Sequence, residues 1–152
     1  MNIENELESI AQELGLVDIR TASISEYSGF PSGHRPCDYL PETRTVITFA
    51  YPLNTTSILN LPQTRNQYTG EYDTVNQILF HAAHRISRLL EEKGFPSLPL
   101  MPTAAVGDLT RLKSDFSHKH SAVQCGLGQF GLNNLLITPE YGPAVRLNSV
   151  FT

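Results

Sequence analysis

One long apolar stripe, between residues 74 and 93, constrains the fold of this chain more than any other feature of its sequence. Its aliphatic side chains recur every three or four residues, which is the spacing of one face of an α-helix: Val75, Ile78, Leu79, Ala82, Ile86, Leu89 and Leu90. Thr74 and Gln77 have the spacing of a capping box, and Gly94 with Pro96 predicts the end of the helix. A helix with a single apolar face requires a second layer to pack against.

The remaining segments predict that this second layer is a sheet. Residues 45–51 are β-branched and aromatic and lie between two prolines, which favours a central strand buried on both faces. Further expected elements are a helix over 3–14 capped by Gly15, strands over 17–21, 135–138 and 145–151, a short helix over 117–125, a surface connection over 26–41, and a turn over 139–143 that joins the last two strands as a hairpin. The predicted class is α/β (α+β), with helices on a mixed sheet, and we expect one domain over residues 1–152.

Charge and cysteine content exclude several kinds of protein. The formal charge of −4 is spread along the chain with no basic block, which argues against binding to a nucleic-acid backbone or a membrane surface. No window approaches the ~20 apolar residues of a membrane span, and the acidic start is not a secretory signal, so we expect a cytoplasmic protein. Cys37 and Cys125 are the only cysteines, whereas a four-iron cluster takes about four thiolates. The chain is therefore not expected to hold an iron–sulfur cluster of its own.

A glycine-rich run, residues 126–131, fits the pattern G-x-G-x-x-G. In a dinucleotide-binding fold this pattern follows a strand and opens a helix, but here a helix-like segment precedes it and a strand-like segment follows. Two interpretations remain. The run is a helix cap with a tight glycine turn, or its exposed backbone amides hold another phosphate-bearing cofactor.

The histidines do not predict a metal site. His81 and His84 are expected on the exposed side of the long helix, and His118 and His120, two residues apart, diverge on a helix. The latter two come just before the glycine-rich run, so they are candidates for lining a site. Asp108 and Asp115 lie in a polar link, where capping or solvation explains acidic residues more often than catalysis does. Catalytic residues remain unknown from these patterns.

Two parts of the chain together resemble a known family. The run 116–123, then Gly126-Leu127-Gly128, Gly131, an Asn at 133 or 134, and 135–143 resemble the N-terminal domain of epoxyqueuosine reductase-like proteins and their relatives, the corrinoid-dependent reductive dehalogenases. Upstream, residues 39–41 and 44–47, and residues 70–73 with Asn76, are similar as well. The resemblance covers about residues 35 to 151.

This resemblance implies a nitroreductase-like fold that binds cobalamin in its base-off form. In the family a ferredoxin-like domain with two four-iron clusters follows and reduces the cobalt. The match ends where that cysteine-rich segment would begin, so we expect a chain truncated before it and a ferredoxin-like domain or protein as a partner. The residues expected to bind the cofactor are His118, His120, Gly126, Leu127, Gly128, Gly131, Asn133, Tyr141 and Arg146.

The sequence also departs from the family pattern. Queuosine-forming members carry an acidic residue, understood to protonate the substrate, where this chain reads Leu100-Met101-Pro102-Thr103-Ala104-Ala105, and a threonine is a poor general acid. Many members carry two arginines after Gly-Pro, whereas here Ala144 fills one place and Arg146 the other. Cofactor binding is therefore better supported than epoxyqueuosine reduction. Two alternatives stay open: an FMN enzyme of nitroreductase type, and a catalytically silent domain that binds a partner. A homodimer is expected.

Overall fold

The computed structural model of this protein describes residues 2–103 and 114–152. Its elements are, in chain order, α1 (Ile3–Leu14), β1 (Asp18–Ser23), the 3-10 helix η1 (Ile24–Tyr27), α2 (Pro36–Tyr39), β2 (Thr45–Pro52), α3 (Thr55–Leu59), α4 (Arg65–Glu92), β3 (Leu98–Pro99), α5 (His118–Gln124), β4 (Gln129–Phe130), β5 (Leu136–Ile137) and β6 (Val145–Phe151). The helices expected over 3–14 and 117–125 and the strand expected over 45–51 are confirmed, and Gly15 caps α1 in the left-handed conformation.

Four of the described strands form the central sheet, in the order β1-β2-β6-β3. The predicted central position of β2 is confirmed, because β1 and β6 pair with its two edges. Each pairing described in this sheet is antiparallel, so no parallel pair of a mixed sheet occurs among these strands. In the register, Thr48 of β2 lies opposite Ser149 of β6. The α/β class, with helices packed on a sheet, is confirmed.

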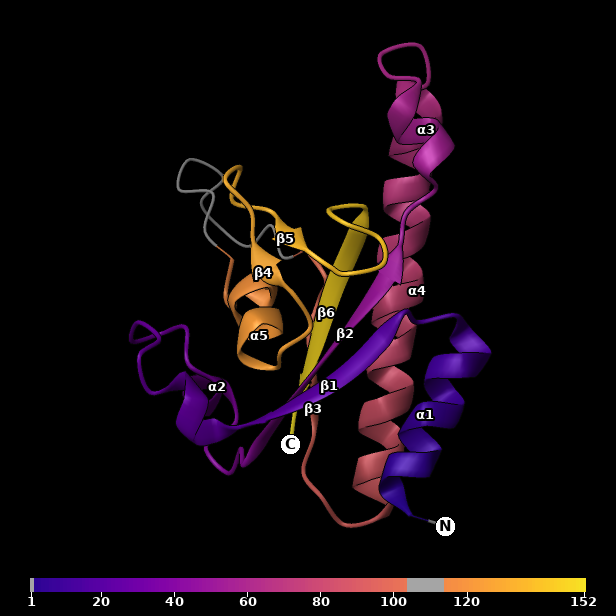
Figure 1. The fold of residues 1–152 in the computed structure, drawn as a ribbon. Helices are drawn as coiled ribbons and strands as arrows, with labels where there is room; N and C mark the ends of the chain where they lie inside the picture. The colour runs from indigo at the N-terminus through magenta and orange to yellow at the C-terminus, as the bar shows by residue number, and fades with distance from the viewer. Residues whose placement is uncertain (1, 104–113) are drawn as a thin grey trace.

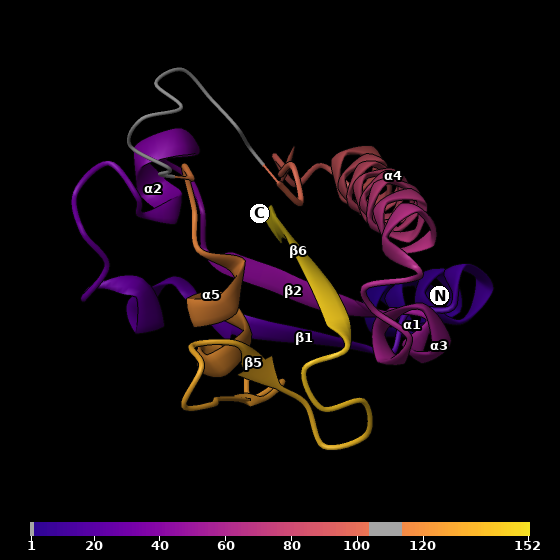
Figure 2. The same ribbon diagram turned by 90° about the horizontal axis from the view of Figure 1, so that it is seen from above.

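Each face of the sheet has its own cover (Figure 1). Helices α1 and α4 pack on one face, and α5 with the β4–β5 hairpin packs on the other, as the view in Figure 2 also shows. The side chains of β2 alternate between the two layers: Ile47 and Phe49 contribute to the core under α4, whereas Ala50 packs with Ala122 of α5. This alternation follows from the two-residue repeat of a strand. Buried positions on both faces explain why β2 is almost wholly apolar.

Helix α4 begins at Arg65 rather than at Thr74, so the predicted start and capping box are wrong. The first turns of α4 are polar, and Figure 1 shows them extending, with α3, beyond the end of the sheet. Because these turns have no sheet to pack on, their sequence carries no apolar stripe that marks the helix. The apolar stripe in the sequence therefore marks only the part of α4 that packs on the core.

The hairpin expected between residues 135–138 and 145–151 is also wrong. Strand β5 pairs with β4, with Phe130 opposite Leu136, and β6 instead joins the central sheet beside β2. The intervening turn carries the chain from the α5 side into the sheet, where the backbone N–H of Leu53 donates to the carbonyl of Ala144 at 2.8 Å. Pairing partners depend on this three-dimensional path, which strand propensity does not encode.

The connection over residues 26–41 is only partly at the surface. Tyr27 is 1% exposed, and its ring packs against those of Phe30 and Phe116, with centroids 5.0 and 6.1 Å away. Pro36 opens α2, in keeping with the preference of proline for the first helical turn. The segment therefore closes the core under α5. Within the described ranges, no helix has the length and apolar character needed to cross a membrane.

Candidate functional site

A continuous chain of buried hydroxyl groups joins α5 to the central sheet. The phenolic oxygen of Tyr27 lies 2.7 Å from Oγ of Ser121, which lies 2.7 Å from Oγ1 of Thr48. The chain continues from Thr48 to Oγ of Ser149 at 3.0 Å, and from Ser149 to Nδ1 of His118 at 3.0 Å. The residues that carry these four hydroxyls are each at most 1% exposed. Each of these buried polar groups is therefore satisfied by its neighbour.

His118, at the surface end of this series of hydroxyl groups, is held in one tautomer. Its Nε2 lies 2.9 Å from the carbonyl oxygen of Met101, which can only accept, so Nε2 carries the proton and Nδ1 accepts from Ser149. Burial lowers the pKa of His118 to about 4, and the charge of Arg146 lowers it further, while the bond to Met101 opposes the shift. At neutral pH, His118 is thus a neutral donor that holds the backbone at Met101.

Tyr27 and Cys125 lie at the end of this series of buried hydroxyl groups that is opposite His118. The Tyr27 hydroxyl is 3.7 Å from Sγ of Cys125. Burial raises the pKa of Tyr27 far above its ordinary value, although the bond from Ser121 opposes the shift, so the phenol stays protonated. Sequence reasoning missed this group, because isolated hydroxyls form no motif. One signal was present: Thr48 interrupts the apolar run from Val46 to Tyr51 in the middle of this strand.

Arg146 of β6 forms a second cluster, on the α4 side of the sheet. Its Nε donates to Oδ1 of Asn76 at 2.7 Å, and its Nη2 donates to Oγ1 of Thr103 at 2.7 Å. The guanidinium carbon lies 4.0 Å from the centroid of the Tyr72 ring. The Tyr72 hydroxyl is 3.2 Å from the same Thr103 oxygen; this contact lowers the pKa of Tyr72, as does the charge of Arg146.

His118 and Arg146 hold the same segment of chain, residues 101–103, through the Met101 carbonyl and the Thr103 hydroxyl. They approach it from different layers, because His118 belongs to α5 and Arg146 contacts α4. The structure thus brings two of the sequence-predicted residues together at the edge of the sheet. Their role toward a cofactor remains a prediction.

The glycine-rich run is a helix end followed by a turn. Gly126 has φ +73° directly after α5, a conformation that side chains rarely adopt, and β4 comes next. The order helix, turn, strand rules out the dinucleotide-binding arrangement. A Cβ on Gly128 would lie 2.5 Å from the backbone oxygen of Ile137, so glycine is needed there for packing against β5 whether or not a ligand binds.

Backbone amides in this run are already engaged within the chain. The N–H groups of Gly126, Leu127 and Gly131 donate to the carbonyls of Val123, Ala122 and Leu135, at 3.0, 2.8 and 2.9 Å. These three amides are therefore not free to form the expected cradle, because the helix cap and the hairpin satisfy them, and the predicted contact of this run with a cofactor stays a prediction. The Leu127 side chain, 3% exposed, belongs to the core.

The other predicted residues lie on the hairpin and its neighbours. His120 is exposed; its Nδ1 is 2.7 Å from Oγ of Ser117, and its ring centroid is 4.8 Å from that of Phe130 on β4. Oδ1 of Asn133 accepts from the backbone N–H of Leu135, and Tyr141 lies in the turn after β5. His120 is thus next to the hairpin, apart from the pair formed by His118 and Arg146.

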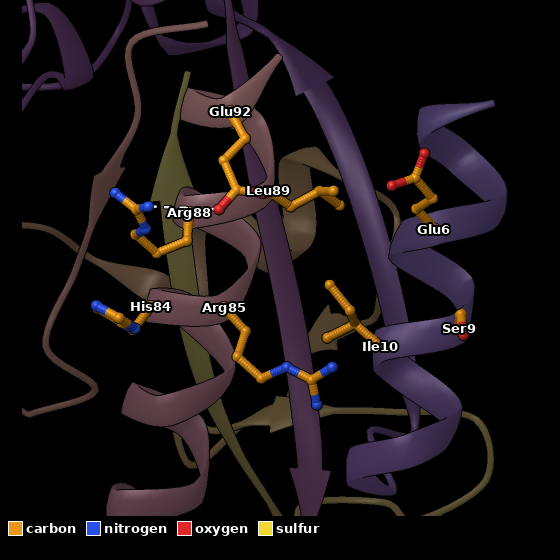
Figure 3. Close-up of a pocket in the computed structure, with 8 residues that line it drawn as sticks. All are labelled: Glu6, Ser9, Ile10, His84, Arg85, Arg88, Leu89 and Glu92. Carbon is orange, nitrogen blue, oxygen red and sulfur yellow. Dashed lines mark hydrogen bonds and ion pairs between the residues drawn. The ribbon is translucent and has the colours of Figure 1, made fainter. Parts of the chain in front are cut away.

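A surface groove of ≈ 450 Å³ between α1 and α4 lies away from all these residues (Figure 3). Arg85 and Arg88 line it. Arg85 forms an ion pair with Glu13 at 2.8 Å, and Arg88 forms one with Glu92 at 3.3 Å. His84 lies at its rim, exposed as expected, and His81 is exposed as well. Exposed ion pairs of this kind contribute little, so the groove is not the candidate site.

Carboxylates and metal-ligand clusters add no further candidate in the described ranges. Asp108 lies outside those ranges, and Asp115 is exposed. In residues 2–103 and 114–152, no group of three or more His, Cys, Asp or Glu side chains is placed to hold a metal ion.

Comparison with known proteins relates the fold to solved structures. No protein-family model and no curated protein matches the chain. An epoxyqueuosine reductase bound to an epoxyqueuosine-modified tRNA-Tyr stem loop is similar with a TM-score of 0.66 and 16% identity, over 99% of this chain and 46% of that one. The Bacillus subtilis epoxyqueuosine reductase, whose aspartate-bearing catalytic loop is swung out of the active site, is similar with a TM-score of 0.65 and 15% identity, over 99% and 45%.

A third similar structure is a reductive dehalogenase described as suggesting a mechanism for B12-dependent dehalogenation. It matches with a TM-score of 0.55 and 19% identity, over 96% of this chain and 19% of that one. The chain spans just under half the length of the epoxyqueuosine reductases that it matches. Nearly the whole chain is thus covered by one part of each larger protein. The resemblance expected from residues 35 to 151 is confirmed at the level of structure: this chain has the fold of the matching part of epoxyqueuosine reductases and reductive dehalogenases.

Proposed function

We propose that this chain is a corrinoid-binding domain of an epoxyqueuosine reductase-like oxidoreductase, which receives its electrons from a cluster-bearing domain or protein. The observation that carries the proposal is the shared fold, which extends over 99% of this chain for epoxyqueuosine reductases and 96% for a reductive dehalogenase tied to B12-dependent chemistry. The motif resemblance over residues 116–143 supports it independently of the fold. Alone, the chain would bind the cofactor without turning over.

The residues fit a corrinoid in one respect and not in another. A phosphate cradle made by the amides of Gly126, Leu127 and Gly131 does not fit, since these donors are engaged within the chain. The β4–β5 hairpin does offer apolar surface, because Phe130, Leu132 and Leu135 are exposed on it. A corrin ring, with its methyl-rich edge, buries apolar area against such side chains. We therefore assign the ring to the hairpin side of the molecule.

Cobalamin would supply a cobalt centre for reductive chemistry, and the chain's own residues would position its surroundings. His118 and Arg146 hold residues 101–103 at the sheet edge, and the hydroxyl chain behind His118 fixes its orientation. Thr103 stands in the segment where queuosine-forming members carry their acid. Its hydroxyl accepts from Arg146 and is a poor proton donor at neutral pH. We therefore propose cofactor binding and assign no proton donor.

A pair of exposed leucines tests the proposed location. Leu132 lies on the hairpin and Leu59 on α3, and both are largely exposed. In spectral titrations with hydroxocobalamin, Leu132→Asp should weaken binding, whereas Leu59→Asp should match wild type. Equal affinities for the three proteins would remove the hairpin from the site. Tighter binding of FMN than of cobalamin by wild type would favour the flavin alternative, and binding of neither would favour the silent, partner-binding one.

A further inference from the structure

Three neighbouring side chains fix the position of the Arg146 guanidinium. Asn76 and Thr103 each accept one of its N–H groups at 2.7 Å, and the Tyr72 ring covers its plane at 4.0 Å. A guanidinium presents its donors in a planar fork, so fixing the plane also fixes the direction of the donors that remain. Of its five N–H groups, two are used by these bonds, which leaves about three for another acceptor.

The charge of Arg146 has no carboxylate partner among residues 2–103 and 114–152. Some of the other described arginines do have one: Arg20 pairs with Asp18 at 3.0 Å and Arg85 with Glu13 at 2.8 Å. The two acceptors of Arg146 are instead a neutral amide and a neutral hydroxyl. A half-buried cation that is hydrogen-bonded but not neutralised attracts an anion more strongly than an exposed, paired one.

Two hydroxyl groups lie beside the guanidinium. Oγ1 of Thr103 accepts from Arg146 and lies 3.2 Å from the Tyr72 hydroxyl; one of these two hydroxyls donates to the other, which leaves the proton of the second for a ligand. The positive charge also reaches neighbouring groups, since it lowers the pKa of both Tyr72 and His118. The cluster thus combines a fixed cation with a pair of hydroxyls, from α4 and from residues 101–103, that has one proton to donate.

We propose that Arg146, Tyr72 and Thr103 form a binding site for an oxyanion, a carboxylate or phosphate group carried by the substrate of this domain. The bidentate fit of an arginine to such groups provides the affinity, and the two hydroxyls set the orientation. The proposal deepens the proposed function, because it names an anionic substrate, but the site can be tested without any corrinoid.

Titration of the isolated full chain with sodium phosphate or sodium acetate is the test, with sodium chloride as the ionic-strength control. A bound oxyanion neutralises Arg146, so the pKa of Tyr72 should rise when the site is saturated, and the His118 ring signals in NMR should shift along the same curve. A saturable response to phosphate alone identifies phosphate esters as the substrate class, and a response to acetate alone identifies carboxylates.

Arg146→Gln should weaken the oxyanion at least about tenfold, as expected for loss of a charged hydrogen bond. Arg85→Gln, which removes an arginine already paired with Glu13, should leave the affinity unchanged. Because Arg146 is half-buried, Thr103→Val at an exposed position serves as the second variant and should weaken binding about threefold without unfolding the chain. The proposal is overturned if chloride produces the same shifts, if neither oxyanion saturates by 10 mM, or if Arg85→Gln weakens binding as much as Arg146→Gln. Failure to bind cobalamin would leave this result standing, so the two proposals fail separately.

Discussion

The Tyr27 hydroxyl and Oγ of Ser121 lie 2.7 Å apart, although 94 positions separate them in the sequence. This bond ties the end of η1 to α5, and Thr48 continues it into β2. Three segments that carry no common motif are therefore joined by one buried network of hydroxyl groups. Such a network of hydroxyl groups stabilises one arrangement of α5 on the sheet, because a different arrangement would leave a buried hydroxyl group without a partner.

Replacing Tyr27 by Phe should destabilise the chain by about 1–3 kcal/mol, because Ser121 loses a buried partner while the ring remains. Urea denaturation followed by circular dichroism measures the change. Tyr39→Phe is the matched control, since Tyr39 is exposed and its hydroxyl bonds to the carbonyl of Gly33 near solvent. An equal loss of stability in both variants would mean that the buried hydroxyl group of Tyr27 contributes no more stability than the exposed hydroxyl group of Tyr39.

Acid should weaken the fold through His118. Its pKa is lowered to about 4 in the folded chain, from an ordinary value near 6.5, so the unfolded chain binds more protons between these values. Stability from this group is therefore complete above pH 6.5 and is lost as the pH falls toward 4, by roughly 1–3 kcal/mol. Urea midpoints at pH 7.5 and 4.5 measure the loss.

His118→Gln should show a smaller loss over the same pH interval than wild type, while His84→Gln, at an exposed position, should behave like wild type. If His118→Gln shows the full wild-type loss, the acid sensitivity arises from other groups.

Two glycine-to-alanine changes should have opposite effects. Gly128→Ala should destabilise the chain by more than about 1 kcal/mol, since its Cβ would meet the Ile137 oxygen at 2.5 Å. Gly70→Ala lies within α4 with nothing within 4 Å of the added Cβ, and should stabilise by about 0.5–1 kcal/mol. Thermal unfolding of both variants decides the point. A neutral Gly128→Ala would show that the hairpin can shift to admit a methyl group.

In the absence of corrinoid, we expect the chain to self-associate through the exposed apolar side chains of the hairpin, Phe130, Leu132 and Leu135. We predict dimers in light scattering at about 100 µM, a concentration at which an interface of standard size is populated. Leu132→Asp should shift the chain to monomer, and Leu59→Asp should not. A monomeric wild-type chain at this concentration would refute the predicted homodimer.

The sequence predicted the elements whose burial leaves a clear apolar pattern. The α1 helix and the core-facing part of α4 were found because burial on one face imposes a helical period, and β2 was found because burial on both faces makes it almost continuously apolar. The first turns of α4 from Arg65 were missed, since they extend past the sheet and have no period to show. The partner of β5 was mistaken because the turn over 139–143 changes layers, a property that local propensity does not contain.

The candidate site was predictable only in part. His118 and Arg146 were identified through the family resemblance, and the structure shows them holding one segment. Tyr72 and Thr48 were not identified, because their roles depend on neighbours about 30 and 100 positions away. The amide cradle was expected from the glycine-rich run and the family resemblance, and the sequence did not show that the amides of Gly126, Leu127 and Gly131 are hydrogen-bonded locally, in a helix end and a hairpin.

Affinity of the isolated chain for cobalamin tests the central claim most directly. The measurement is an anaerobic spectral titration with hydroxocobalamin and with cob(II)alamin, followed to a cofactor concentration near 1 mM, where an interaction of about −4 kcal/mol is half saturated. We predict a saturable shift to the base-off spectrum and tighter binding than for FMN in a parallel titration. The absence of any spectral change at 1 mM, in a chain that circular dichroism shows to be folded, would contradict the assignment of this chain as a corrinoid-binding domain.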